Sequence, residues 1–159
     1  MGQERGFEAP PWEAMAGTSG LDLLRGMIAG RFPAPPIAET LGFRLVEADP
    51  GRALFEGRSS PSVLNPLGLV HGGWALTLID SAAGCALHTE LDAGIGYTTV
   101  ETKVNFVRPI APDGAIVRCE GRVLSRGRQI ATAEAKLVSA EGKLLAHGTS
   151  TLIILPPRG

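Results

Sequence analysis

The longest apolar segment of the chain runs from residue 74 to residue 88 and is apolar on nearly every face of a helix. Bulky and small side chains alternate along it, the bulky ones being Leu76, Leu78, Ile79 and Leu87 and the small ones Ala75, Ala82, Ala83, Gly84 and Ala86. A helix that is apolar all round is a buried one. Counted from Leu69, its ~20 residues approach the length of a membrane span, but His71, the Gly72-Gly73 pair and Asp80 argue against a span. A buried carboxylate is costly unless it is satisfied, so Asp80 and the glycines are the first candidate functional residues.

Six other segments have the pattern of strands. They cover residues 41–49, 52–57, 97–107, 115–124, 129–138 and 144–155. The first two form a hairpin that turns at residues 49–51, and tight turns join the last four. In the segment 97–107, the even positions from Val100 to Phe106 alternate with the odd positions from Thr99 to Asn105, as in a two-faced strand. Meanders of this kind give antiparallel sheets. We therefore predict an α+β fold in which a curled antiparallel β-sheet wraps around one long central helix and buries it on all sides.

The first 37 residues differ from the rest of the chain. Residues 1–18 are rich in Gly, Pro and Glu and predict a loose arm. A short helix is expected at residues 21–28, beginning after Ser19 or Gly20 and ended by Gly30 and the prolines of residues 33–36. The 159 residues favour one domain with a sizeable core. We expect an N-terminal arm with a short helix over residues 1–37 and one folded domain over residues 38–155.

Composition and charge exclude several classes of protein. The chain has 44% hydrophobic and 19% charged residues, and 15 Lys and Arg against 16 Asp and Glu leave a formal net charge of -1. Nucleic-acid and anionic-membrane partners favour a basic excess, so neither is expected. The N-terminus lacks the basic-then-apolar pattern of a signal peptide. Cys85 and Cys119 have no metal-like spacing and are predicted to be buried, reduced thiols. These features predict a cytoplasmic protein.

A spaced motif surrounds the start of the central helix. The run Asn65-x5-His71-Gly72-Gly73-x6-Asp80, followed by Thr-Val-Glu-Thr-Lys-Val-Asn-Phe-Val-Arg-Pro at residues 99–109, resembles hotdog-fold acyl-CoA thioesterases of the phenylacetate-degradation (PaaI-like) type. The resemblance covers residues 38–155 and leaves out the arm. One branch of the family has Gln and Glu where this chain has Asn65 and Asp80, so the chain resembles the Asn/Asp branch.

The resemblance implies a fold, an assembly and an activity. In the hotdog fold, two subunits pair their sheets edge to edge. The related 4-hydroxybenzoyl-CoA thioesterases place the active site across that dimer interface. The implied reaction is the hydrolysis of an acyl-CoA substrate, with an aryl or medium-chain acyl group, to the free acid and coenzyme A. The implied assembly is a homodimer or a dimer of dimers, a homotetramer. No metal-ligand cluster or dinucleotide fingerprint is present, so no cofactor is expected.

The family assigns Asp80 the role of general base or nucleophile, and the sequence leaves both open. The plainer alternative is a carboxylate satisfied by hydroxyl or backbone groups inside the core. Thr99 aligns with a Ser or Thr that helps hold the water beside the carboxylate. Because the length of the preceding loop varies, Thr98 is an alternative, and both residues are also ordinary strand threonines.

The helix start carries the other catalytic candidates. A helix N-terminus offers unpaired N–H groups and a partial positive charge, so the Gly72 N–H is a candidate oxyanion donor. The alternative is that the glycines only allow a tight helix start. Asn65, seven residues earlier, is a candidate donor to the same carbonyl or to the water, although an Asn before a Pro is usually a turn former. His71 is either a base or a residue that packs and orients the loop.

Further residues are candidates for substrate binding. Coenzyme A brings phosphates, which favour basic side chains at the rim of a pocket. Arg108, Arg126 and Arg128 lie near predicted strand ends, although arginines are common on any surface. Gly73 and Trp74 complete the substrate-binding set with His71, and Trp74 alternatively fills the core. His88 and His147 are isolated and are predicted to be structural.

Spacing along the helix predicts a shared site. Gly72 and Asp80 are eight residues apart, which is ~12 Å along a helix axis. One reacting carbonyl cannot touch both if they come from the same helix. Either only one is catalytic, or Asp80 of one subunit meets Gly72 of another, which implies a dimer.

Two other functions fit the same fold class. Hotdog proteins include enoyl-CoA hydratases and dehydratases, but these lyases need a His paired with an acid in an arrangement that His71 and Asp80 do not supply well. A non-catalytic acyl-CoA sensor would lack the carboxylate or carry a DNA-binding module. The chain has Asp80 and has no basic domain, so hydrolysis of a thioester is the favoured function among the three.

Overall fold

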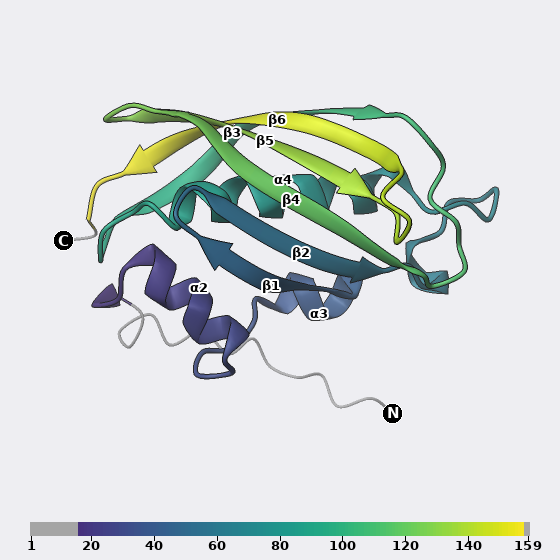
Figure 1. The fold of residues 1–159 in the computed structure, drawn as a ribbon, viewed down its shortest axis with the longest axis horizontal. Coiled ribbons are helices and arrows are strands. Elements are labelled where there is room, and N and C mark those ends of the chain that lie inside the picture. The colour runs from purple at the N-terminus through teal and green to yellow at the C-terminus, as the bar shows by residue number, and fades with distance from the viewer. Residues whose placement is uncertain (1–15, 158–159) are drawn as a thin grey trace.

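The structure, a computed structural model, describes residues 16–157, in which a six-stranded sheet curls around one long helix (Figure 1). The strands are β1 (Phe43–Asp49), β2 (Arg52–Arg58), β3 (Gly96–Phe106), β4 (Ile116–Arg126), β5 (Ile130–Val138) and β6 (Leu144–Leu155). The helices are α2 (Gly20–Ile28), α3 (Pro36–Leu41), α4 (Gly72–His88) and the 3₁₀ turn η1 (Pro61–Val63). The strand order is β1-β2-β4-β5-β6-β3 and every pair is antiparallel. The predicted fold class is confirmed.

Helix α4 lies against the sheet at very close range. Leu78, Ile79 and Leu87 are fully buried against the strands. Small residues permit the contact, since a Cβ on Gly121 of β4 would lie 2.1 Å from the carbonyl oxygen of Ala82. The alternation of bulky and small residues in α4 is therefore the sequence signal for a helix seated directly on a sheet. Within residues 16–157, no helix combines the length and the apolar character needed to cross a bilayer.

The sheet does not bury α4 on all sides, and this part of the prediction is wrong. Leu76 is 39% exposed, and Thr77, Asp80 and Ser81 on the same side of the helix are half-buried. This open stripe lies beside β3, an edge strand of the sheet. The sheet has six strands and curls around only part of the helix circumference, so the stripe has no cover within the described chain.

The elements before β1 differ in part from the prediction. Helix α2 begins as expected after Ser19, whose Oγ accepts a hydrogen bond from the Asp22 N–H at 3.2 Å. Helix α3 was not predicted, and residue 41, expected to open a strand, is the last residue of this helix. Pro36 suits the first helical turn and Gly42, with φ 68°, ends the helix in the left-handed conformation. The predicted loose arm lies mostly outside the described residues.

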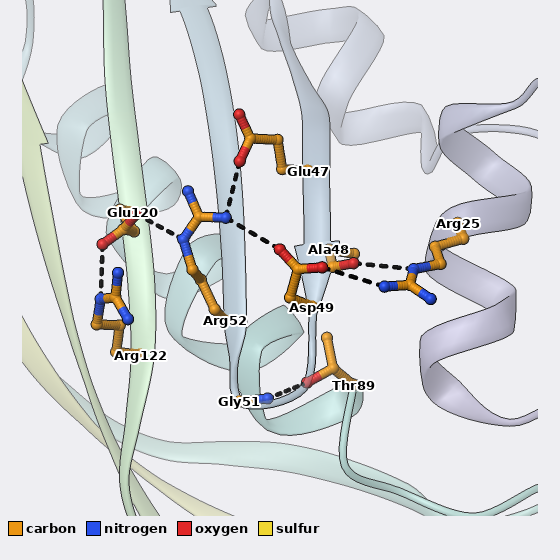
Figure 2. A network of polar contacts seen from close by, with 9 residues as sticks. All are labelled: Arg25, Glu47, Ala48, Asp49, Gly51, Arg52, Thr89, Glu120 and Arg122. Carbon is orange, nitrogen blue, oxygen red and sulfur yellow. Dashed lines mark hydrogen bonds and ion pairs between the residues drawn. The ribbon is translucent and has the colours of Figure 1, made fainter.

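A network of charged side chains ties α2, the β1–β2 turn and β4 together (Figure 2). The Arg52 guanidinium donates to Glu47 and Glu120, both at 2.7 Å, and these hydrogen bonds raise the pKa of Arg52. Arg25 of α2 donates to the carbonyl of Ala48 at 3.0 Å. At the end of α4, the Thr89 hydroxyl accepts from the Gly51 N–H at 2.8 Å. These contacts fix the C-terminal end of α4, far from Gly72. They stabilise the fold and do not form part of a candidate site.

Candidate active site

Asp80 projects from the middle of α4 onto hydroxyl groups of the sheet. Its Oδ1 accepts a hydrogen bond from Thr99 at 2.9 Å and another from Thr102 at 3.0 Å, both on β3. The Thr102 hydroxyl lies 2.8 Å from the Ser150 hydroxyl of β6. Asp80 Oδ2 makes no hydrogen bond to any residue from 16 to 157. The carboxylate is thus held by one oxygen while the other stays available. The prediction included Thr99 but missed Thr102 and Ser150.

A β-bulge explains why two threonines three positions apart reach one carboxylate. Thr99 pairs with Leu152 and Glu101 pairs with Thr151, so Val100 is an extra residue in β3. A bulge of this kind disrupts the alternation of the strand. Residues on either side of it then face α4 together, whereas the predicted alternation put Thr99 and Thr102 on opposite faces. That part of the prediction is wrong. Thr98, the alternative to Thr99, is exposed.

The start of α4 leaves one backbone donor unused. His71 Nδ1 accepts from the Gly73 N–H at 2.8 Å, and the His71 carbonyl accepts from the Trp74 N–H at 3.0 Å. No hydrogen bond to the Gly72 N–H occurs within the described part of the chain. His71 therefore caps and orients the helix. The Gly72 N–H remains as a donor at the positive end of the helix.

Glycine at position 73 serves this cap. A Cβ there would lie 3.0 Å from His71 Nδ1, which is tighter than about nine in ten real Cβ contacts. A side chain at position 73 would therefore require the imidazole to shift by a few tenths of an ångström from its capping position.

Asn65 closes its own loop in front of the helix. Its side-chain Oδ1 accepts from the Leu67 N–H at 3.0 Å and the Leu69 N–H at 3.1 Å. Its backbone N–H donates to the Leu69 carbonyl at 2.8 Å. The side-chain Nδ2 makes no hydrogen bond among residues 16–157. The Oδ1 atom of the amide therefore forms the turn, and the N–H groups of Nδ2 are unused.

A cavity of about 360 Å³ opens beside the helix start. Its lining is largely apolar and consists of Val70, Gly72, Ala75, Phe106, Val107, Arg108, Pro109, Ile110, Leu145 and Ala146. The Phe106 ring lies 3.0 Å from the point that a Cβ on Gly72 would occupy. Arg108 donates to the Leu144 carbonyl at 2.8 Å. An apolar hollow with one cation and one free N–H can take a ligand with an apolar part and an oxygen acceptor.

Three predicted binding residues lie away from this cavity. Trp74 is 3% exposed and its Nε1 donates to the Leu41 carbonyl at 2.7 Å, so it fills the core. Arg126 donates to the Glu90 carbonyl, past the other end of α4. Arg128 is exposed in the same turn as Arg126. Within one subunit, only Arg108 of the three arginines lies at the cavity.

Neither cysteine is a candidate nucleophile. Burial raises the pKa of the Cys85 thiol to about 12 and raises that of Cys119 further, so both are protonated at neutral pH. His88 is also structural, since its ring packs edge-on against Tyr97 at 5.4 Å and burial lowers its pKa. Among the described residues, no three His, Cys, Asp or Glu side chains are grouped so that they could hold a metal ion. Among residues 16–157, this leaves the Asp80 carboxylate, the Gly72 N–H and the Asn65 amide as the candidate groups.

Comparisons with known proteins identify the family of the chain. The family model of the thioesterase superfamily matches residues 67–146, which include the helix start, the carboxylate and its hydroxyls. Human acyl-coenzyme A thioesterase 13 is 30% identical over 136 residues, covering 84% of this chain and 96% of that protein. A phenylacetic acid degradation-related protein from Ralstonia eutropha is 28% identical, with a TM-score of 0.73 over 82% of this chain and 98% of that one. PaaI of E. coli, 19% identical with a TM-score of 0.74 over 84% of this chain and 94% of its own, shares the fold. The chain therefore belongs to the thioesterase superfamily and is a hotdog-fold thioester hydrolase.

Proposed function

We propose that the protein hydrolyses acyl-CoA thioesters to the free acid and coenzyme A at a site shared by two subunits. One observation carries the proposal: Asp80 is anchored through Oδ1 with Oδ2 available, on the same helix whose first N–H, that of Gly72, is unused. The similarity to human acyl-coenzyme A thioesterase 13 supports coenzyme A as the thiol of the substrate.

The reaction follows from these two groups. The thioester carbonyl oxygen accepts from the Gly72 N–H, which stabilises the negative charge that develops there, an effect typically worth ~10²–10³ in rate. In the general-base route, Asp80 Oδ2 takes a proton from a water as the water oxygen bonds to the carbonyl carbon. In the nucleophilic route, Oδ2 itself bonds to that carbon and water later cleaves the resulting anhydride. In both routes the C–S bond breaks, the sulfur leaves as a thiolate and a proton from the water restores the thiol.

Helix geometry supports a site shared with a second copy of the chain. Eight residues place Gly72 and Asp80 ~12 Å apart along α4, too far to serve one carbonyl. The open stripe of α4 around Leu76 and the exposed Val100 of β3 are the uncovered apolar surface beside Asp80. An antiparallel α4 from a second copy would cover this surface and bring its Asp80 to Gly72, creating two equal sites.

The same pairing would bring the three predicted arginines to one site. The cavity beside Gly72 would take the acyl group, with the Phe106 ring on one wall and Arg108 at the rim. Antiparallel helices would carry the turn with Arg126 and Arg128 of the second copy to this end of the site. Three guanidinium groups from two subunits would then face the phosphates of coenzyme A.

The hydratase alternative is weakened by the cap at the helix start. A hydratase or dehydratase needs an imidazole available for proton transfer. His71 Nδ1 already accepts from the Gly73 N–H, which fixes the ring as a helix cap. The carboxylate and its hydroxyls, by contrast, match what hydrolysis requires.

A substrate panel tests the function. Aryl, medium-chain and long-chain acyl-CoA thioesters are incubated with the protein, and the released thiol is detected colorimetrically. We expect kcat/KM of at least ~10⁴ M⁻¹s⁻¹ for an aryl or medium-chain member, with no change on addition of a chelator. No thiol release from any member would contradict the proposal. Activity lost on chelation and restored by zinc would contradict the metal-free mechanism.

Paired threonine variants test the site. Replacing Thr99 with Val removes one hydrogen bond to a carboxylate, typically worth ~1.5–3 kcal/mol, so kcat should fall by ~10-fold or more. Thr98→Val is the matched control, because this neighbouring hydroxyl is exposed and should keep kcat within about twofold. Steady-state kinetics on the best substrate provide the measurement. Equal losses in the two variants would show that the hydroxyl at position 99 has no special role.

A further inference from the structure

The hydroxyls behind Asp80 form a chain with a defined direction. A threonine hydroxyl carries a single hydrogen, and Thr102 gives that hydrogen to Asp80 Oδ1. The 2.8 Å contact between Thr102 and Ser150 must therefore be donated by Ser150. Hydrogen bonds run from Ser150 to Thr102 and from Thr102 to the carboxylate, with Thr99 as the second donor to the same oxygen.

Ser150 sits where the fold alone would favour an apolar residue. It is 1% exposed, and its neighbours on the inner face of β6 are Gly148 and Leu152, both buried. Its hydroxyl has Thr102 as its one hydrogen-bond partner in the described structure. A buried hydroxyl gains little net stability from such a bond and is costly when unpaired. Its placement is explained by what it does to Thr102, its cross-strand partner in the register of β3 and β6.

The series of hydrogen-bonded hydroxyls fixes the orientation of the Asp80 carboxylate. The terminal torsion of an Asp side chain is broad, so an unsupported carboxylate would exchange its two oxygens between positions. Donors on both sides of the β3 bulge, Thr99 and Thr102, converge on Oδ1. We infer that Thr102 and Ser150 are positioning residues that fix Asp80 so that Oδ2 is the one oxygen that acts on the thioester or its water. This inference rests on the proposed function, in which Asp80 is the reacting group.

Four variants test the chain of hydroxyls by steady-state kinetics. Thr102→Val keeps the shape and removes the donor, so kcat should fall by ~10–100-fold with KM changed less than about twofold. Thr102→Ser restores the hydroxyl and should return kcat to within about threefold of the unmodified protein. Ser150→Ala removes the donor to Thr102 and should lower kcat by a smaller factor of about 3–10. Thr149→Val, an exposed threonine next to Ser150, is the matched control and should leave kcat unchanged.

The double variant Thr102→Val/Ser150→Ala shows whether Ser150 acts through Thr102 or the two hydroxyls act independently. If Ser150 acts through Thr102, adding Ser150→Ala to Thr102→Val should change kcat by less than about twofold. Thermal melting gives a second readout. Thr102→Val leaves the buried Ser150 hydroxyl unpaired, so it should melt at a lower temperature than the double variant.

Each outcome decides the inference. Three results would each overturn it. The first is a double variant in which the kcat losses of the two single variants multiply. The others are a Thr102→Ser variant as slow as Thr102→Val and a Thr102→Val variant with normal kcat. If Thr102→Val does not fold, Ser150→Ala and Thr102→Ser decide alone, since a normal Ser150→Ala or a slow Thr102→Ser overturns the inference. A normal Thr102→Val beside an inactive Asp80→Asn would overturn the positioning role and leave the proposed function standing. An active Asp80→Asn would overturn the reacting role of Asp80 on which the inference rests, whereas no thiol release from any acyl-CoA of the panel would overturn the proposed function.

Discussion

Asp80→Asn is expected to lower kcat by ~10²–10⁴, the usual scale for the loss of a general base. The substitution keeps the volume of the side chain and an acceptor for the hydroxyls of Thr99 and Thr102, so the fold should survive. It replaces the available Oδ2 by an amide that can neither take a proton nor attack a carbonyl. KM should change much less than kcat, because the cavity beside Gly72 is untouched.

Stability measurements complete this experiment. A carboxylate with no catalytic role would give an Asp80→Asn variant with near-normal turnover and equal or greater thermal stability. Asp92→Asn, on an exposed loop, is the matched control for the loss of a charge and should keep normal kcat. Near-normal turnover of Asp80→Asn on the best substrate would refute the mechanism, whatever its melting temperature.

Mixing two inactive variants is expected to restore activity. Asp80→Asn chains lack the acting carboxylate. Asn65→Asp chains lack the unused side-chain N–H donor that, in the proposed site, would join the Gly72 N–H on the thioester carbonyl or hold the water. The second change keeps an oxygen acceptor for the N–H groups of Leu67 and Leu69, so the loop should keep its shape. A hybrid dimer has one site built from the intact Asn65 of one chain and the intact Asp80 of the other. Random exchange should therefore recover about one quarter of the original activity, since half the dimers are hybrids with one good site each.

Hybrid dimers can be isolated through two different affinity tags, one on each chain. Their activity per dimer should be about half that of the unmodified dimer, as expected for one intact site of two. If the hybrids form and show no activity, each site lies within a single subunit, and the distance argument along α4 is wrong. A fully active monomer in sedimentation at micromolar concentration would lead to the same conclusion.

The long elements of the fold could be predicted because their patterns extend over many residues. The apolar run of α4 and the turn signals between strands repeat often enough to outweigh local exceptions. Helix α3 spans six residues, too few for a helical period to appear, and its opening Pro36 suggested an end rather than a beginning. The open stripe of α4 escaped prediction because Leu76 is as apolar as its buried neighbours.

The site could be predicted only as far as the motif reaches. Gly72, Asp80 and Thr99 belong to a spaced pattern. Thr102 lies in the run that follows, but regular alternation puts it on the opposite face from Thr99, and only the bulge in β3 turns it to Asp80. Ser150 lies outside the motif and reaches the site through Thr102, its cross-strand partner. Asn65 shows that a pattern can support two roles at once, since one end of its amide makes the turn that the plainer interpretation predicted.

The bulge in β3 also affects how readily other strands could add to this edge of the sheet. An edge strand with regular pairing is a template on which any extended chain can add, and this is a common route to aggregation. The extra residue at Val100 disturbs the ladder and bends the strand in the middle of its length. An incoming strand would find regular backbone spacing only on one side of the bulge at a time. In the proposed dimer a second copy covers this edge, so the irregularity that aims two threonines at a carboxylate would oppose indiscriminate strand addition to subunits that have not yet paired.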